Sequence, residues 1–162
     1  MKRTFGAIFC LGLALIANAE EKLRVIDLAP DAPVSAEAAE RGRKYLEAQE
    51  AAAKITPDEA MQFMQRLRET MDSGHEQIRA GAMDGKAIRN HSIALNKLEE
   101  EGVRFGGPFA PFQSCGTAST DAALSWRGLV TSNQAQFVEY FQKYIAASNE
   151  CIQAAQLAAS KG

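Results

Sequence analysis

The chain has 162 residues, with 18 lysines and arginines against 20 aspartates and glutamates, which gives a formal net charge of −2. A length of this order fits one globular domain. The weakly acidic balance argues against a protein that binds nucleic acid or anionic membranes in general, because such binding relies on positive surface charge.

Residues 1–19 have the three-part pattern of a secretory signal peptide. A basic start with Lys2 and Arg3 precedes an apolar run over 7–16, and small residues end the segment at Ala19. The run is roughly half the 20 or so apolar residues that a membrane-spanning helix needs. We therefore expect cleavage after Ala19, export to a bacterial periplasm and no membrane span in the mature chain.

Cleavage would change the charge and the cysteine count. The loss of Lys2 and Arg3 leaves 16 basic residues against 20 acids, a net charge of −4. Cys10 is lost as well, so that Cys115 and Cys151 remain. Two cysteines in a compartment that permits oxidation predict one disulfide.

Residues 20–34, with two prolines, form an expected extended lead-in, and a single helical domain is expected over 35–162. Ser35 is a suitable N-cap for a first helix over about 35–54. The apolar face of this helix is thin and made largely of small residues, which would let another helix approach closely.

The clearest local signal is the start of a second helix at Thr56. Thr56 suits the N-cap, Pro57 the first helical position, and Glu59 completes a capping box. The apolar stripe that follows has helical spacing and consists of Ala60, Phe63, Met64, Leu67 and Met71. The helix either ends at Gly74 or continues to Gly81, so one or two helices fit this stretch.

A third helix is expected over about 86–101, after the turn signal Asp84-Gly85. Its apolar face consists of Ala87, Ile88, His91, Leu95 and Leu98. Three consecutive glutamates stand at its C-terminal end, where the helix dipole disfavours negative charge. We expect this end to fray or to lie in water.

Two further helices are expected over about 118–130 and from either Thr131 or Asn133 to about 159. The last helix has a regular stripe of Phe137, Phe141, Tyr144, Ser148, Cys151, Ala155 and Ala158, which indicates antiparallel packing. No pair of strands with a hairpin turn stands out. The predicted fold is all-α, an up-and-down antiparallel bundle of four to five helices with one disulfide.

The positions of the cysteines predict which helices the disulfide joins. Cys115 and Cys151 lie equally far in sequence before and after Asn133. Residues equidistant from the turn of an antiparallel helix pair lie side by side, whereas a break at Thr131 would offset them by roughly one turn. The sequence contains no Cys-x-x-Cys motif, the spacing that redox-active cysteine pairs favour. The disulfide is therefore expected to close the open end of the last hairpin.

The stretch 102–116 is the strongest candidate for a binding site. Its glycines and prolines frame three phenylalanines, which either cap the open end of the bundle or form an exposed patch for a partner. In the second case an acidic ridge beside them would steer a basic partner. The predicted partner-binding residues are Glu99, Glu100, Glu101, Arg104, Phe105, Phe109 and Phe112.

A soft-metal site is the weaker hypothesis. Met71 and His75 share a helix face, and His91 lies on the apolar face of the next helix. Methionine is also a common core residue, and a core histidine with one hydrogen bond explains His91 equally well. No established metal-binding spacing is present, and no cofactor is expected.

No catalytic motif is present either, so the sequence does not predict an enzyme. We expect a periplasmic domain that binds another protein without catalysis, its partner being a toxin, an effector or a second copy of the chain. In architecture and compartment it is similar to the small disulfide-bonded helical immunity proteins that bacteria export to block toxins, which implies that the acidic ridge and the aromatic loop contact the toxin. The alternatives are a periplasmic metal or envelope-stress sensor and a helical subunit of an envelope assembly.

Overall fold

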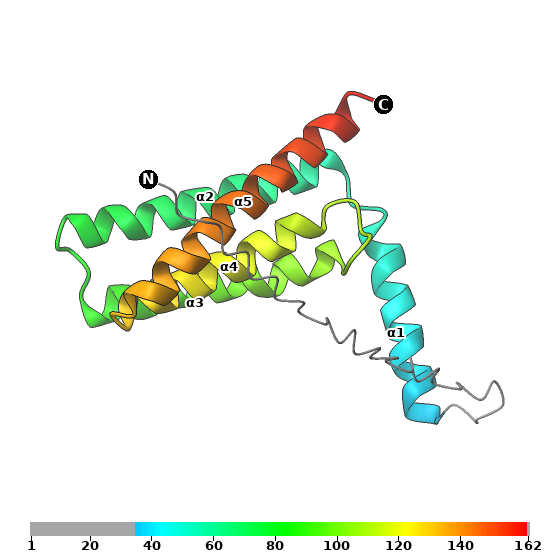
Figure 1. Ribbon diagram of the computed structural model, residues 1–162, viewed down its shortest axis with the longest axis horizontal. Coiled ribbons are helices and arrows are strands. Elements are labelled where there is room, and N and C mark those ends of the chain that lie inside the picture. The colour runs from blue at the N-terminus through cyan, green and yellow to red at the C-terminus, as the bar shows by residue number, and fades with distance from the viewer. Residues whose placement is uncertain (1–34, 162) are drawn as a thin grey trace, which may run out of the picture. The chain divides into compact units, whose positions relative to one another are not determined.

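The computed structural model describes residues 35–161, so the expected signal peptide (1–19) and lead-in (20–34) lie outside the described residues. The described part consists of helices joined by short turns and contains no strand. These elements are α1 (Ala36–Ala52), α2 (Pro57–Arg79), α3 (Gly85–Gly102), the 3-10 helix η1 (Val103–Phe105), α4 (Gln113–Val130) and α5 (Gln134–Ala159) (Figure 1).

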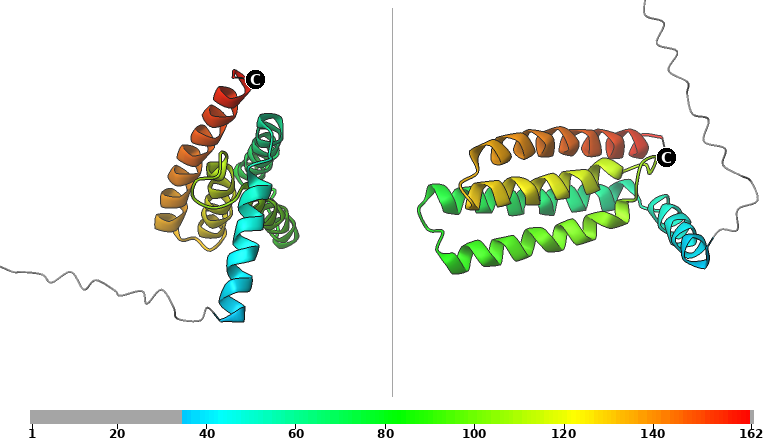
Figure 2. Two further views of the ribbon diagram at one scale, coloured as in Figure 1. Left: turned by 90° about the vertical axis from the view of Figure 1, so that its right-hand side faces the viewer. Right: turned by 60° about the horizontal axis from the view of Figure 1, so that its bottom comes forward.

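Helices α2 to α5 form an up-and-down antiparallel bundle, which confirms the predicted fold class. Each packs against the next in the chain, and α5 closes the ring against α2. Figure 2 shows these four helices lying side by side along the bundle. Within residues 35–161, none of the helices combines the length and the apolar character needed to cross a membrane.

The core of the bundle is built from the stripes that the helical spacing predicts. Burial of each large apolar side chain contributes roughly 1.5 to 3 kcal/mol to folding. The predicted stripe residues that are buried are Ala60, Phe63, Met64, Leu67, Met71, His91, Leu95, Leu98, Tyr144, Ser148, Cys151 and Ala155, and Ala122 and Trp126 of α4 are buried with them.

Side-chain caps begin α2 and α5. The backbone N–H of Glu59 donates to Thr56 Oγ1 at 3.2 Å, and the N–H of Thr56 donates to Glu59 Oε2 at 2.8 Å, so the predicted capping box is confirmed. At the start of α5, Asn133 accepts from the N–H of Gln136 at 3.2 Å. Thr131 instead donates its hydroxyl to a carbonyl at the end of α4, so Asn133 is the N-cap.

Helix α2 is one continuous helix of 23 residues that passes through Gly74. Gly74 is buried, and a Cβ built on it would lie 2.6 Å from Cε1 of His91. Glycine is therefore required here so that His91 of α3 can approach the backbone, and it does not end the helix. Gly81, with φ of +64°, follows the end of α2 in the left-handed conformation that suits glycine.

Helix α1 does not pack as predicted. Its N-cap is confirmed, since Ser35 Oγ accepts from the N–H of Ala38 at 3.2 Å. However, Ala52 is its one buried residue, and its contact with another element is at η1 (Figure 1). The predicted close approach of another helix to its small residues is wrong, because α1 contacts η1 and the turn after it near its C-terminal end, while most of its length is exposed. Its exposed length carries ion pairs such as Arg43–Glu47.

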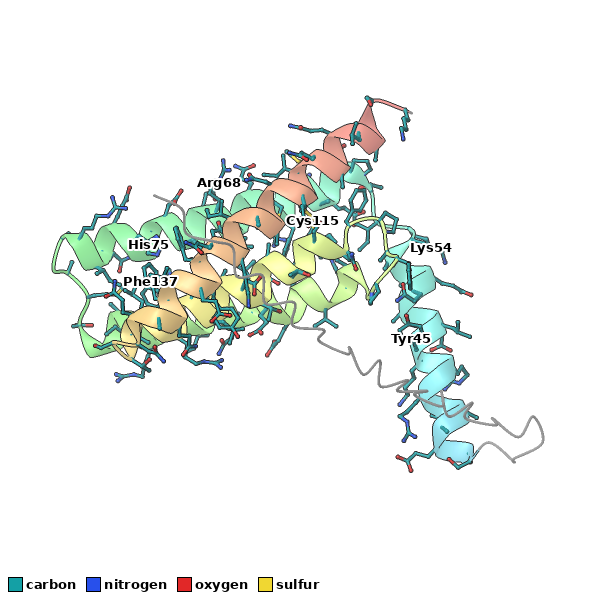
Figure 3. All side chains as sticks on the ribbon, viewed as in Figure 1. Tyr45, Lys54, Arg68, His75, Cys115 and Phe137 are labelled. Atoms are coloured by element: carbon teal, nitrogen blue, oxygen red, sulfur yellow. A yellow bond between two sulfur atoms is a disulfide. The ribbon has the colours of Figure 1, made fainter. Side chains whose placement is uncertain are left out.

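The predicted disulfide is confirmed between Cys115 of α4 and Cys151 of α5. The two Cα atoms are 5.0 Å apart and both side chains are fully buried. Helix α4 begins earlier than the predicted 118, so Cys115 lies in its first turn (Figure 3). The disulfide therefore joins α4 and α5 at the end of the bundle where α1 and η1 also lie.

Candidate partner-binding surface

At this end of the bundle, a tight turn projects Phe109. The N–H of Ala110 donates to the carbonyl of Gly107 at 3.1 Å. Pro108 occupies the second position of this turn, and Phe109 occupies the third with φ of +80°. A second-position proline and a positive third-position φ are features of a type II turn, whose third position favours glycine or asparagine. Phe109 thus holds a backbone conformation unsuited to a bulky side chain.

The three phenylalanines of the predicted binding stretch have different environments. Phe105 and Phe112 are 0% and 4% exposed and belong to the core, whereas Phe109 is 98% exposed. Of the two alternatives for these phenylalanines, capping of the bundle therefore holds for Phe105 and Phe112. The exposed interpretation survives for Phe109 alone.

At Gly106 the chain packs closely against the last turn of α1. Its φ of 80° and ψ of −175° fall in a region that is essentially restricted to glycine. A Cβ on Gly106 would lie 2.7 Å from the Cβ of Ala52 and 2.9 Å from that of Ala110. The close packing of α1 against the 106–112 turn therefore holds the base of the projecting phenylalanine.

A groove of about 590 Å³ lies beside the turn, and we name it the end groove. Val103, 76% exposed, and the half-exposed ring of Tyr45 give it apolar surface. Its lining includes no lysine or arginine. The lining residues are Tyr45, Ala48, Gln49, Glu99, Gly102, Val103, Gly106, Gly107, Pro108, Gln113, Gly116, Thr117, Thr120 and Asp121.

Asp121 is the buried charged group of the end groove. It is only 8% exposed, and this burial raises the pKa of its carboxyl group above the usual value of 3.8, against an opposing effect of Lys143. Within residues 35–161 the structure shows no hydrogen bond or ion pair to the Asp121 carboxylate. Lys143 itself donates to Glu139 at 2.7 Å.

The predicted acidic ridge is divided by the packing. Glu99 lines the end groove and Glu100 is exposed. Glu101 pairs with Arg66 of α2 at 2.5 Å and with Arg104 at 3.8 Å. These arginines neutralise the C-terminal end of α3, which continues into η1. Of the two expected alternatives, fraying is therefore wrong, whereas contact with water holds for Glu100. 

Arg104 is engaged within the domain. Its guanidinium also lies 3.7 Å from Glu59 and 5.2 Å from the centre of the Phe105 ring. It therefore helps to cover Phe105.

The candidate metal ligands lie at the opposite end of the bundle. Met71 is a core residue, and His91 packs with its ring centre 4.1 Å from that of Trp126. The ring centre of His75 lies 5.4 Å from that of Phe141 and 6.2 Å from that of Phe137, and Figure 3 labels His75 and Phe137. Within residues 35–161, no group of three or more histidines, cysteines or acids is placed to hold a metal ion.

His91 is buried and His75 is partly buried. The Nε2 atoms of His75 and His91 are buried without a hydrogen-bond partner among the described residues. The single hydrogen bond expected for a core histidine is thus not formed at Nε2 of His91, because this atom faces the backbone of Gly74. Burial lowers the pKa of both imidazoles below the usual 6.5, and their proximity adds to this for His91.

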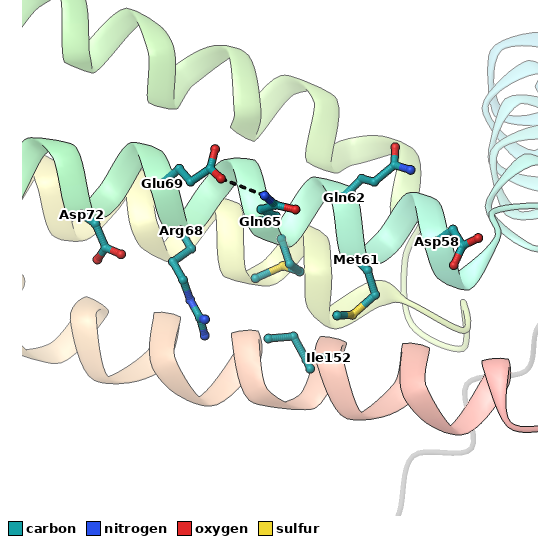
Figure 4. A pocket seen from close by; sticks show the side chains of 9 residues that line it. Asp58, Met61, Gln62, Gln65, Arg68, Glu69, Asp72 and Ile152 are labelled. Carbon is teal, nitrogen blue, oxygen red and sulfur yellow. Dashed lines mark hydrogen bonds between the residues drawn. The ribbon is translucent and has the colours of Figure 1, made fainter.

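A second groove, of about 370 Å³, runs between α2 and α5 (Figure 4). Met61 and Arg68 point from α2 toward α5, and Ile152 points back toward α2. Gln65 and Glu69 also line this groove, and Gln65 donates to Glu69 at 2.9 Å. This groove contains none of the residues that the sequence singled out for partner binding.

Sequence reasoning did not single out Tyr45, Val103 or Asp121. For Asp121 a signal existed, since it lies three residues after Ala118 and four before Ser125, both of them inward positions of α4. An acid on the inward arc of a helix is unusual and marks a position worth testing. Tyr45 and Val103 carried no such signal, because their place in the end groove depends on how α1 meets the turn.

Comparison with protein-family models, characterised proteins and solved structures found no match to this chain. The surface formed by Phe109 and the end groove is therefore the feature from which a function is inferred.

Proposed function

We propose that this protein is a non-catalytic protein-binding domain whose partner docks on Phe109 and the end groove. The observation that carries the proposal is the state of Phe109, which is 98% exposed and has a positive φ. Neither the local backbone preference nor the core gains from a phenylalanine at this position.

The energetics favour a role in binding. A non-glycine residue at such a φ costs of the order of 1 to 3 kcal/mol, and strained residues of this kind concentrate at functional sites. A phenylalanine that a partner covers buries about 150 to 250 Å², worth roughly 4 to 6 kcal/mol at 25 cal/mol per Å². Phe109 thus has the character of an interface hot spot.

The surroundings of Phe109 reduce the cost of binding. Pro108 restricts the turn, Gly106 packs it on α1, and the disulfide at Cys115 closes the helix pair that follows. A side chain already held in place loses little conformational entropy when a partner binds. Such a rigid projection suits insertion into a pocket of another protein.

As the finer form of the proposal, the domain is an inhibitor of the immunity-protein kind, which neutralises a toxin or another enzyme in the periplasm. A rigid aromatic projection beside an acidic groove supports this, because it can occlude a cleft of the partner. The periplasmic setting depends on the export predicted from residues 1–19.

The test is affinity capture from envelope extract with the wild type, Phe109→Ala and the matched control Leu157→Ala. Leu157 is an exposed apolar residue of α5 and should be neutral. We expect one partner to be captured by the wild type and the control, and its affinity for Phe109→Ala to fall about 30-fold or more, as for a 2 kcal/mol hot spot. Equal capture by Phe109→Ala and the wild type would refute the proposal. For the inhibitor form, the purified protein should abolish the activity of the captured enzyme.

A further inference from the structure

We propose that the end groove receives a lysine or arginine side chain of the partner, which pairs with Asp121 while Phe109 is covered. This inference rests on the proposed function and specifies the chemistry of the docking segment. It concerns a protein segment that combines a cationic residue with neighbouring apolar ones.

The Asp121 carboxylate has no hydrogen-bond or ion-pair partner among the described residues. The residue is 8% exposed, lines the end groove and accepts no hydrogen bond from residues 35–161. Its oxygens keep some contact with water, because they are not among the fully buried side-chain atoms without a partner. Most of the side chain is nevertheless withdrawn from water, which is unfavourable for an ionised carboxylate, and buried charges are normally paired. The nearby Thr117 hydroxyl donates to the carbonyl of Gln113 at 3.4 Å, so it is directed along its own helix.

The lining of the end groove is negatively charged. Glu99 of α3 and Asp121 of α4 are the charged residues of its lining, and both are acids. Lys143 does not line the groove and is already paired with Glu139 on its own helix. A cation that enters the groove from outside therefore meets carboxylates from two helices and no lysine or arginine in the lining, while Lys143, outside the lining, already exerts some attraction on Asp121.

The end groove also offers apolar surface to the stem of a basic side chain. Long basic side chains bury their aliphatic stem on apolar surface while the charged head reaches a polar group. Val103 and Ala48 offer such a surface, and the ring of Tyr45 can attract a cation. A segment that places its cation at Asp121 would cross the rim toward Pro108 and its neighbour Phe109.

The experiment uses the full chain and three blocked tripeptides, acetyl-Gly-X-Gly-amide, with arginine, lysine or citrulline as X. Citrulline has nearly the shape of arginine but is neutral, so it isolates the role of charge. Binding is followed by NMR through backbone amide shifts and the side-chain carboxyl ¹³C signal of Asp121. We expect the two cationic peptides to shift amides around Glu99, Val103 and Asp121, and to lower the pKa of Asp121.

Two variants separate a specific pair from general attraction to an acidic protein. Asp121→Asn keeps the shape of the side chain and should weaken the arginine peptide at least tenfold. Glu150→Gln removes an exposed acid of α5 and should leave the affinity unchanged. Thermal melting checks folding, and Asp121→Asn should melt no lower than the wild type because it removes a desolvated charge.

The inference is overturned if citrulline and arginine peptides bind alike, if Asp121→Asn binds arginine as the wild type does, or if no peptide binds. These outcomes differ from a failure of the proposed function. If Phe109→Ala loses the captured partner while Asp121→Asn retains it at full affinity, the docking surface stands and the cation pocket does not. If Phe109→Ala retains the partner, the docking proposal itself fails, whatever the peptides do.

Discussion

The contact between Gly74 and His91 predicts that Gly74→Ala destabilises the wild type but stabilises a variant that lacks the His91 side chain. Glycine inside a helix is normally about 0.5 to 1 kcal/mol less favourable than alanine. At Gly74, however, an added Cβ would lie 2.6 Å from Cε1 and 3.1 Å from Cδ2 of His91, well inside ordinary contact. The imidazole cannot easily retreat, because it is 8% exposed and its ring centre lies 4.1 Å from that of Trp126.

The expected magnitude follows from these two opposing effects. Overpacking of this kind costs about 1 to 3 kcal/mol, so Gly74→Ala should lower the free energy of unfolding by about 1 to 2 kcal/mol after the helical gain. In a His91→Ala background the obstacle is gone. There, the same Gly74→Ala change should raise the free energy of unfolding by about 0.5 to 1 kcal/mol.

The assay is urea unfolding at pH 7.5, followed by circular dichroism, of the wild type, both single variants and the double variant. The double-mutant cycle should give a coupling energy of about 1.5 to 3 kcal/mol. Gly42→Ala is the matched control, because nothing lies within 4 Å of a Cβ built on Gly42 in α1. If Gly74→Ala stabilises the protein, or if His91→Ala leaves its effect unchanged, the close approach of α3 to α2 at Gly74 is wrong.

Three further predictions address the disulfide, the histidines and the turn. Replacing Cys115 and Cys151 by alanine removes a cross-link with a sequence separation of 36. The free energy of unfolding, measured by urea titration, should fall by about 3 to 4 kcal/mol. An unchanged midpoint would contradict the idea that the disulfide closes the helix pair. Because burial lowers the pKa of His75 and His91 below 6.5, the unfolded chain takes up protons first. Stability should therefore be greatest above pH 6.5 and fall as the pH drops through the lowered pKa values, and a melting temperature that is flat from pH 7.5 to 5 would argue against buried neutral imidazoles. Phe109→Gly relieves roughly 1 to 3 kcal/mol of backbone strain and costs about 0.4 to 1 kcal/mol of unfolded-state entropy, so its melting temperature should equal or exceed that of the wild type, and a marked decrease would show that Phe109 supports the fold.

Local sequence signals were sufficient for most of the bundle. The capping box at Thr56 and the apolar stripe after it predicted the start and the buried face of α2, because both depend on residues within a few positions of each other. The disulfide followed from the spacing of Cys115 and Cys151 about a single turn. Where two local signals competed, as between Thr131 and Asn133, the sequence could not choose.

The proposed binding surface shows the limit of local sequence signals. The sequence identified 102–116 as unusual but treated its phenylalanines as equivalent, since nothing local distinguishes Phe105 from Phe109. The turn that reverses the chain at Pro108 sends one ring outward, and the packing against α1 and α2 buries the others. The role of Asp121 depends equally on contacts between helices that are distant in the chain.

The sequence by itself determined the helical class, most helix limits, the core stripes and the disulfide, because hydrophobic periodicity, capping and spacing act over short distances along the chain. Tertiary structure alone decided that α2 passes through Gly74, that α1 stays largely outside the bundle, that Phe109 is exposed and that Asp121 lines the end groove. Each of these features depends on which side chains from separate helices pack against each other, and no single segment of the sequence specifies those contacts.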